Sequence, residues 1–123
     1  GLLRSLEELR LSQGSIRGTL PTELAALPAL RILSLASHRV SGSLPTQLGV
    51  LRRVEVLDVN DNQLSGSLPT GIFASADALR RIDLYDNSLS GTLPTEAGAA
   101  RLLVRFGVEE NRLSGRLPTQ LGR

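Results

Sequence analysis

The chain has 123 residues, of which 41% are hydrophobic and 2% aromatic, so its core must be built mainly from aliphatic side chains. It contains no Cys, which excludes disulfides and thiolate metal sites but does not fix a compartment. The net charge is +2, all 14 basic residues are Arg, and no apolar run is long enough to span a membrane.

One six-residue phrase occurs five times. LSGSLP at 64–69 returns with small changes as IRGTLP at 16–21, VSGSLP at 40–45, LSGTLP at 89–94 and LSGRLP at 113–118. The successive Leu-Pro pairs are separated by 24, 24, 25 and 24 residues. A fixed period of this length predicts a repeat architecture, in which units too small to bury their own apolar side stack on one another.

In chain order, each unit places three apolar residues at fixed distances ahead of its phrase. These residues are Leu6, Leu9 and Leu11, then Leu30, Leu33 and Leu35, then Val54, Leu57 and Val59, then Leu79, Ile82 and Leu84, then Leu103, Phe106 and Val108. The alternation in each L-x-L core predicts a short strand with its apolar residues facing inward, at 9–11, 33–35, 57–59, 82–84 and 106–108. Stacked units would pair these strands into a parallel sheet.

The position two residues before each phrase holds Gly14, His38, Asn62, Asn87 and Asn111, and we call it the ladder position. An Asn there can donate to and accept from backbone groups of its own and neighbouring units. In the phrase itself Leu64 and Leu68 are predicted to return to the core, while Gly66 allows a bend. The phrase is therefore predicted to be the corner of a coil.

The rest of each unit is predicted to lie on the outer, convex side. TQLGVLRRVEV, which follows Pro45, has apolar residues at near-helical spacing and predicts a short helix or 3₁₀ turn. The fourth unit has one extra residue within 70–81, which is predicted to bulge this side.

Together these elements resemble the leucine-rich repeat family, in its 24-residue plant-type subclass with the pattern LxxLxLxxNxLSGxxPxxLxxLxx. The resemblance covers residues 6–121, and it implies an α/β repeat solenoid: a right-handed, curved coil of about five repeats with a parallel sheet on its concave side. Known carriers include receptor-kinase ectodomains, polygalacturonase-inhibiting proteins and surface antigens of trypanosomatid protozoa. Gly14 and His38 depart from the family Asn, and the Cys-paired caps of plant members are absent. Residues 1–123 are interpreted as one domain, either whole or a piece of a longer array.

Little in the sequence indicates catalysis. His38 is the single His and occupies a ladder position, where a structural role is favoured over a catalytic or metal-binding one. No nucleophile motif surrounds the nearby serines. The chain is therefore predicted not to be an enzyme, with no cofactor and no metal ion.

The outward strand positions predict a recognition surface whose charge is polarised across its width. Basic residues lie before or at the starts of the strands, among them Arg4, Arg31, Arg52, Arg80, Arg81, Arg101 and Arg105. Acidic residues gather where the third to fifth strands end: Asp58, Asp61, Asp83, Asp86, Glu109 and Glu110. Tyr85 lies among these acids and is the best single candidate for a binding hot spot.

Two interpretations of these charges stay open. They can be ordinary solvated side chains that partly neutralise each other, or they can bind a protein with a basic patch, with Arg81 and Arg105 contributing beside the acids. A divalent cation held by the four Asp residues has no loop motif to support it. Nucleic acid is disfavoured, because acids lie beside the Arg residues and aromatic platforms are lacking.

Three functions are therefore considered. Non-catalytic protein recognition through the concave sheet is favoured. The alternatives are a structural segment that self-associates through uncapped ends, and a ligand-sensing cell-surface ectodomain, which rests on the resemblance alone. The compartment stays open, with the cell surface slightly favoured by the resemblance.

Overall fold

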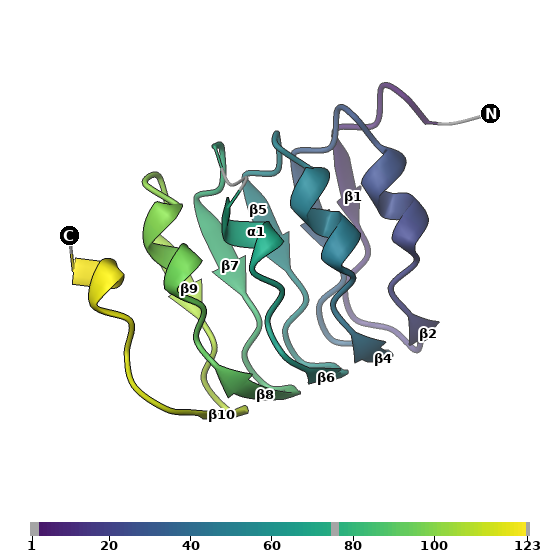
Figure 1. The fold of residues 1–123 in the computed structure, drawn as a ribbon. Helices are drawn as coiled ribbons and strands as arrows, with labels where there is room; N and C mark the ends of the chain where they lie inside the picture. The colour runs from purple at the N-terminus through teal and green to yellow at the C-terminus, as the bar shows by residue number, and fades with distance from the viewer. Residues whose placement is uncertain (1–2, 75–76, 123) are drawn as a thin grey trace.

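The structure is a computed structural model and describes residues 3–74 and 77–122. Five units stack side by side as successive turns of a curved, right-handed coil (Figure 1). Each unit contributes one strand to each of two parallel sheets and one short helix to the convex side. The repeat architecture predicted from the 24-residue period is confirmed.

The first sheet lines the concave side. Its strands are β1 (Glu8–Arg10), β3 (Ile32–Ser34), β5 (Val56–Asp58), β7 (Arg81–Asp83) and β9 (Arg105–Gly107). They pair in parallel in the order β1-β3-β5-β7-β9. Each begins one residue earlier than predicted, which is within the usual variation of strand ends.

The core lies between this sheet and the convex helices. In the second to fourth units all nine predicted inward residues are buried, with Leu33 and Ile82 fully inaccessible. The corresponding residues of the first and fifth units are half-buried, apart from Leu11, which is exposed. The difference follows from stacking, because an inner unit is covered on both sides and an outer one on a single side.

The recurring phrase forms more than a corner. Part of each copy pairs with the next as a second parallel sheet, made of β2 (Arg17–Thr19), β4 (Arg39–Ser43), β6 (Gln63–Gly66), β8 (Ser88–Thr92) and β10 (Arg112–Ser114). The sequence predicted only the bend, which is also present: the phrase glycines have φ between 79° and 98°. Glycine adopts this left-handed conformation without strain, so the chain can turn inside a paired strand.

The convex helices confirm the prediction of short helical turns. They are η1 (Thr22–Ala26), η2 (Thr46–Val50), α1 (Gly71–Ala74), η3 (Thr95–Ala99) and η4 (Thr119–Gly122), all 3₁₀ except α1. A proline precedes η1, η2 and η3, with φ between −71° and −63°, and its fixed backbone angle suits the start of a helix. The predicted bulge within 70–81 lies partly outside the described residues.

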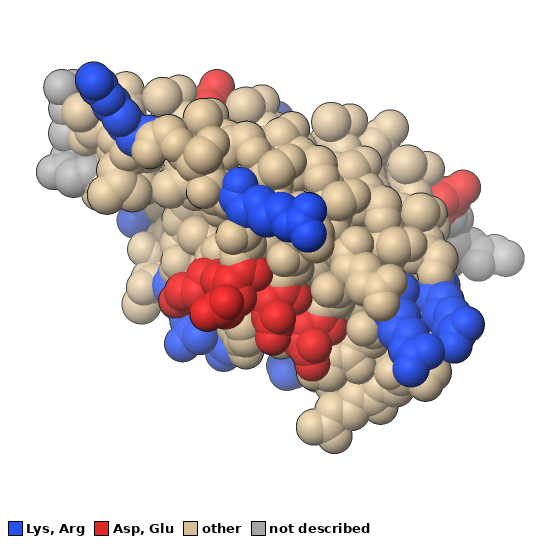
Figure 2. Space-filling view, turned by 90° about the horizontal axis from the view of Figure 1, so that it is seen from below, with Lys and Arg blue, Asp and Glu red and all other residues tan. Residues whose placement is uncertain are grey.

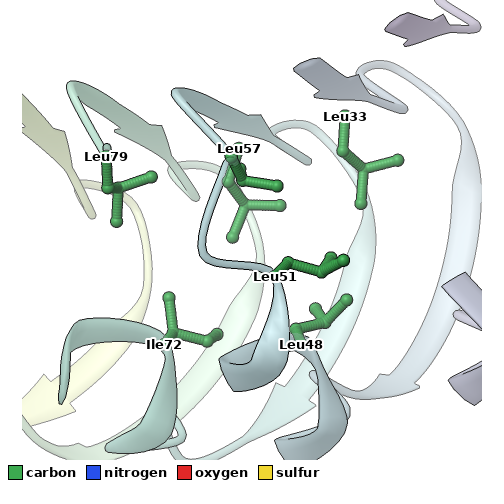
Figure 3. Close-up of a pocket in the computed structure, with 7 residues that line it drawn as sticks. Leu33, Leu48, Leu51, Leu57, Ile72 and Leu79 are labelled. Atoms are coloured by element: carbon green, nitrogen blue, oxygen red, sulfur yellow. The ribbon is translucent and has the colours of Figure 1, made fainter. Parts of the chain in front are cut away.

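A small cavity of about 20 Å³ lies inside the core. Figure 3 shows the labelled side chains pointing toward one another from the concave strands, the convex helices and the segments between them. The full lining is Leu33, Leu48, Leu51, Val54, Leu57, Ile72 and Leu79. The lining is wholly aliphatic, so this cavity offers no polar group for chemistry.

The ladder asparagines hold the turns between the sheets. The Asn87 side-chain nitrogen lies 3.1 Å from the carbonyl oxygens of Val59 and Leu84 and 3.3 Å from that of Tyr85, and its oxygen accepts from the Leu64 N–H at 2.9 Å. Asn62 and Asn111 make the same four kinds of contact. Each amide therefore satisfies backbone groups of its own and neighbouring units, as predicted.

His38 fills the same position with fewer contacts. Its Nε2 lies 3.1 Å from the Leu11 carbonyl oxygen, whereas its buried Nδ1 has no hydrogen-bond partner among the described residues. A Cβ added at Gly14 would lie 2.7 Å from the imidazole Cε1. The two departures from the Asn pattern are therefore linked, because the larger ring of His38 occupies space that a side chain at position 14 would need.

Candidate functional site

The outward residues of the concave sheet form two rows in register. The first row is Glu8, Ile32, Val56, Arg81 and Arg105, and the second is Arg10, Ser34, Asp58, Asp83 and Gly107. The charges of the third to fifth units are thus placed side by side, because parallel strands lie about 4.8 Å apart. Four of the nine predicted binding residues lie in these rows: Asp58, Arg81, Asp83 and Arg105.

Asp83 lies at the centre of this group but has no exposed surface. One of its carboxylate oxygens accepts from Arg105 Nε at 2.6 Å, and the other accepts from Arg81 Nε. The two arginine side chains remain 47% and 56% exposed, so their outer nitrogens face the concave surface. Asp83 was predicted to be open to a partner, and the arginines cover it; a direct contact would require them to move.

Gly107 makes this arrangement sterically feasible. A Cβ at this position would lie 3.0 Å from Asp83 Oδ1, 3.1 Å from Glu109 Oε2 and 3.5 Å from the Tyr85 ring. The missing side chain lets these three groups converge beside Arg105. The hydrogen bond and the charge of Asp83, with smaller contributions from Tyr85 and Glu109, raise the pKa of Arg105 above its ordinary value.

Asp58 is also engaged within the sheet. Its carboxylate accepts from Ser34 Oγ at 3.3 Å and from the Asn60 side-chain amide. The residue is half-buried, like Tyr85. Asp58 and Asp83 are thus held by protein groups, which distinguishes them from the acids at the strand ends.

Four exposed acids, Asp61, Asp86, Glu109 and Glu110, form what we call the acidic edge. Figure 2 shows acidic side chains gathered in one patch on the face seen from below, toward which the concave strands run in Figure 1. Across residues 3–74 and 77–122, none of the four lies within 4.0 Å of a basic group. Their charges are therefore available to a partner.

Three residues of the acidic edge turn the chain out of the concave sheet. Asp61, Asp86 and Glu110 have φ values of 52°, 57° and 50°, in the left-handed region. Asp adopts this conformation more readily than most residues, so two of the acids have a conformational reason for their position. Glu110 has no such reason, and Gln13 and Ser37 occupy the same conformation without a charge.

Sequence reasoning missed an ion-pair network at the edge where the strands begin. Arg31 Nε lies 2.8 Å from Glu55, and Arg31 Nη1 lies 3.4 Å from Glu7, so one arginine joins three units. The hydrogen bond and charge of Arg31 lower the pKa of Glu55, with a smaller contribution from Arg80. The signal was present in the sequence, because these residues of alternating charge are 24 positions apart.

The described part of the chain contains neither a candidate metal site nor a helix that could span a membrane. No group of three or more potential His, Asp or Glu ligands is gathered there in a way that could hold a metal ion. Within the same residues, every helix is too short or too polar to cross a bilayer.

A sequence model of the Leucine Rich Repeat family matches residues 53–74 and 78–99. Similar solved structures include three from Arabidopsis thaliana. The receptor kinase HAESA, in complex with the peptide hormone IDA and the co-receptor SERK1, is 32% identical, with a TM-score of 0.93. The match covers 98% of this chain and 20% of the HAESA chain.

The other two also contain partners. The ectodomain of GASSHO1/SCHENGEN3 with CASPARIAN STRIP INTEGRITY FACTOR 2 is 31% identical, with a TM-score of 0.91 and coverage of 94% and 14%. The BIR3–SERK2 complex is 34% identical, with a TM-score of 0.87 and coverage of 92% and 60%. The chain thus spans less than two thirds of each. No curated protein sequence matches it significantly.

Proposed function

Because the chain is a leucine-rich repeat protein similar to plant receptor-kinase ectodomains, we propose that it is a non-catalytic module that binds a protein or peptide across its concave sheet. The proposal draws support from the similar structures, which include a complex with a peptide hormone and the co-receptor SERK1 and the complex of BIR3 with SERK2. What those proteins bind does not identify the partner of this chain. The chemistry of the partner must therefore be argued from the concave side itself.

The observation that carries the proposal is the exposed charge of the acidic edge. Like charges in adjacent units repel each other mildly, and inside the described residues none of these four forms an ion pair. A partner that places Arg or Lys side chains there would relieve the repulsion and gain orientation and association rate. Tyr85 lies beside this edge and provides an aromatic contact, which is a common binding hot spot.

The arginine pair adds a second anchor. Arg81 and Arg105 use their Nε atoms to hold Asp83, which leaves the outer nitrogens of both side chains exposed. Guanidinium groups bind carboxylates well. A partner segment with an acidic group over this pair and a basic group at the acidic edge would match both ends of the concave strands.

A photo-crosslinking experiment tests this proposal. Tyr85 is replaced by the photoreactive p-benzoylphenylalanine, and the protein is irradiated in extracts of its source cells. We expect a discrete crosslinked protein or peptide that disappears when the acidic edge is neutralised by Asp61→Asn, Asp86→Asn, Glu109→Gln and Glu110→Gln. Asn is chosen at positions 61 and 86 because it tolerates the left-handed conformation.

The matched control neutralises two acids on the convex helices, Glu23→Gln and Glu96→Gln, and should leave the crosslink intact. Added salt should weaken the crosslink in the wild type. Equal crosslinking by the neutralised variant, or no specific crosslink from Tyr85, would contradict binding at this surface.

A further inference from the structure

A second candidate surface lies on the convex side, between η1 and η2, which run side by side in Figure 1. A groove of about 340 Å³ separates them. Its walls are formed by Ala25, Leu27, Pro28, Leu30, Val50, Leu51, Arg52 and Arg53. The groove lies between the first two helices of the convex row and the segments that lead from them to β3 and β5.

Val50 is an unusual wall residue. It is 64% exposed, although it is a large aliphatic residue. The equivalent positions of the second and fifth units, twelve residues before the ladder position, hold Ala26 and Ala99. The larger side chain deepens the groove with apolar surface that the coil itself does not bury.

Arg52 and Arg53 give the groove its charge. Both also line an adjoining hollow with Arg31, Glu55 and Ala78. Glu55 is already held by Arg31 at 2.8 Å, and no carboxylate of residues 3–74 or 77–122 lies within 4.0 Å of Arg52 or Arg53. The other units carry at most one arginine at these two positions, so the doubled charge is particular to this groove.

We propose that this groove binds an acidic amphipathic peptide segment of a protein partner. Aliphatic side chains of the segment would pack against Val50 and the leucines, and its carboxylates would pair with Arg52 and Arg53. The surface goes beyond the proposed function, because it lies on the opposite side of the coil from the concave sheet. A peptide fits better than an anionic membrane, since the site is recessed and Glu55 lies on the same edge.

Fluorescence anisotropy with a defined probe tests the inference. The probe is a fluorescein-labelled peptide made of four Leu-Leu-Glu repeats, and the comparison peptide has Lys in place of Glu. Saturable binding of the Glu peptide should weaken by about tenfold or more in the double variant Arg52→Glu/Arg53→Glu, and by a smaller factor in Val50→Ala. Circular dichroism should confirm that each variant is folded.

Two controls separate this surface from others. The double variant Arg112→Glu/Arg116→Glu changes the net charge equally and should bind the probe like the wild type. The neutralised acidic edge should also leave binding unchanged, so the outcome is independent of the concave proposal. The inference is overturned by unsaturable binding, by equal binding to the Arg52→Glu/Arg53→Glu variant, by preference for the Lys peptide, or by binding to phosphatidylglycerol vesicles instead of the peptide.

Discussion

The ladder position is built in two ways in this chain. In the third to fifth units an Asn amide reaches three carbonyl oxygens and accepts one N–H. In the second unit His38 makes a single hydrogen bond and leaves a buried ring nitrogen without a partner among the described residues. The family sequence model matches the third and fourth units, and neither the second nor the fifth, although the fifth has Asn111.

The difference teaches that a repeat can lose its key residue if its neighbour also changes. An imidazole is larger than an amide, and Gly14 in the preceding unit leaves the space that it occupies. Read separately, Gly14 and His38 are two defects in the Asn column. In the structure they are one packing solution, obtained at the loss of several hydrogen bonds.

The largest loss of stability is expected when a ladder Asn is removed. Asn87→Ala should lower the free energy of unfolding by about 3 kcal/mol, because several buried backbone groups lose their partner at once. His38→Ala should lower it by only about 1 kcal/mol, since one hydrogen bond is lost. Urea unfolding followed by circular dichroism measures both, and equal losses at the two sites would contradict the difference described above.

Restoring the family residue should remove the difference. His38→Asn is expected to raise the free energy of unfolding by about 1 kcal/mol, because an amide can reach carbonyls that the imidazole does not. The same urea titration checks this gain. A loss of stability would mean that the imidazole's packing outweighs the missing hydrogen bonds.

The coupling between the two departures can be measured directly. Gly14→Ala should destabilise the wild type by up to about 1 kcal/mol, because the new Cβ would force the His38 ring away from the Leu11 carbonyl. The same substitution made in the His38→Ala background should cost much less. A double-mutant cycle with no interaction energy would show that the two positions are independent.

The smallest expected effect on stability is at the Arg31–Glu55 ion pair, outside the ladder position, and it depends on pH. Because Arg31 lowers the pKa of Glu55 in the folded state, this pair should stabilise the fold above the unfolded pKa of Glu55. That contribution should be lost as the pH falls through the lowered value. Glu55→Gln should therefore flatten the acid side of the stability profile slightly, and an unchanged profile would mean that solvent screens the pair completely.

Much of the fold was predictable because burial in a coil repeats at every turn. The three inward positions of each unit could be counted from the Leu pattern, and Ile82 and Leu57 are buried where that count placed them. The second sheet was missed, because a short LSG segment indicates a bend and its pairing exists only between stacked units. No local property of residues 63–66 distinguishes a free corner from a paired one.

The sequence predicted which side chains of the concave strands face outward, but not how accessible to solvent each of them is. Alternation correctly placed Asp83 on the outward side of β7. It could not reveal that Arg81 and Arg105 would bend over its carboxylate, because that depends on side-chain packing between two strands. The left-handed backbone at Asp61 and Asp86 was missed for a related reason, since a count of positions carries no information about the turn after the strand.

Stacking also limits how far a change can spread. In the described structure the backbone of each strand and helix approaches only that of its counterpart in an adjoining unit. Substitutions two or more units apart, such as Gly14→Ala and Asn87→Ala, should therefore have additive free energies. Such a protein can be modified like a row of separate modules, where the residues of one turn are free to vary as long as the turns beside it still fit.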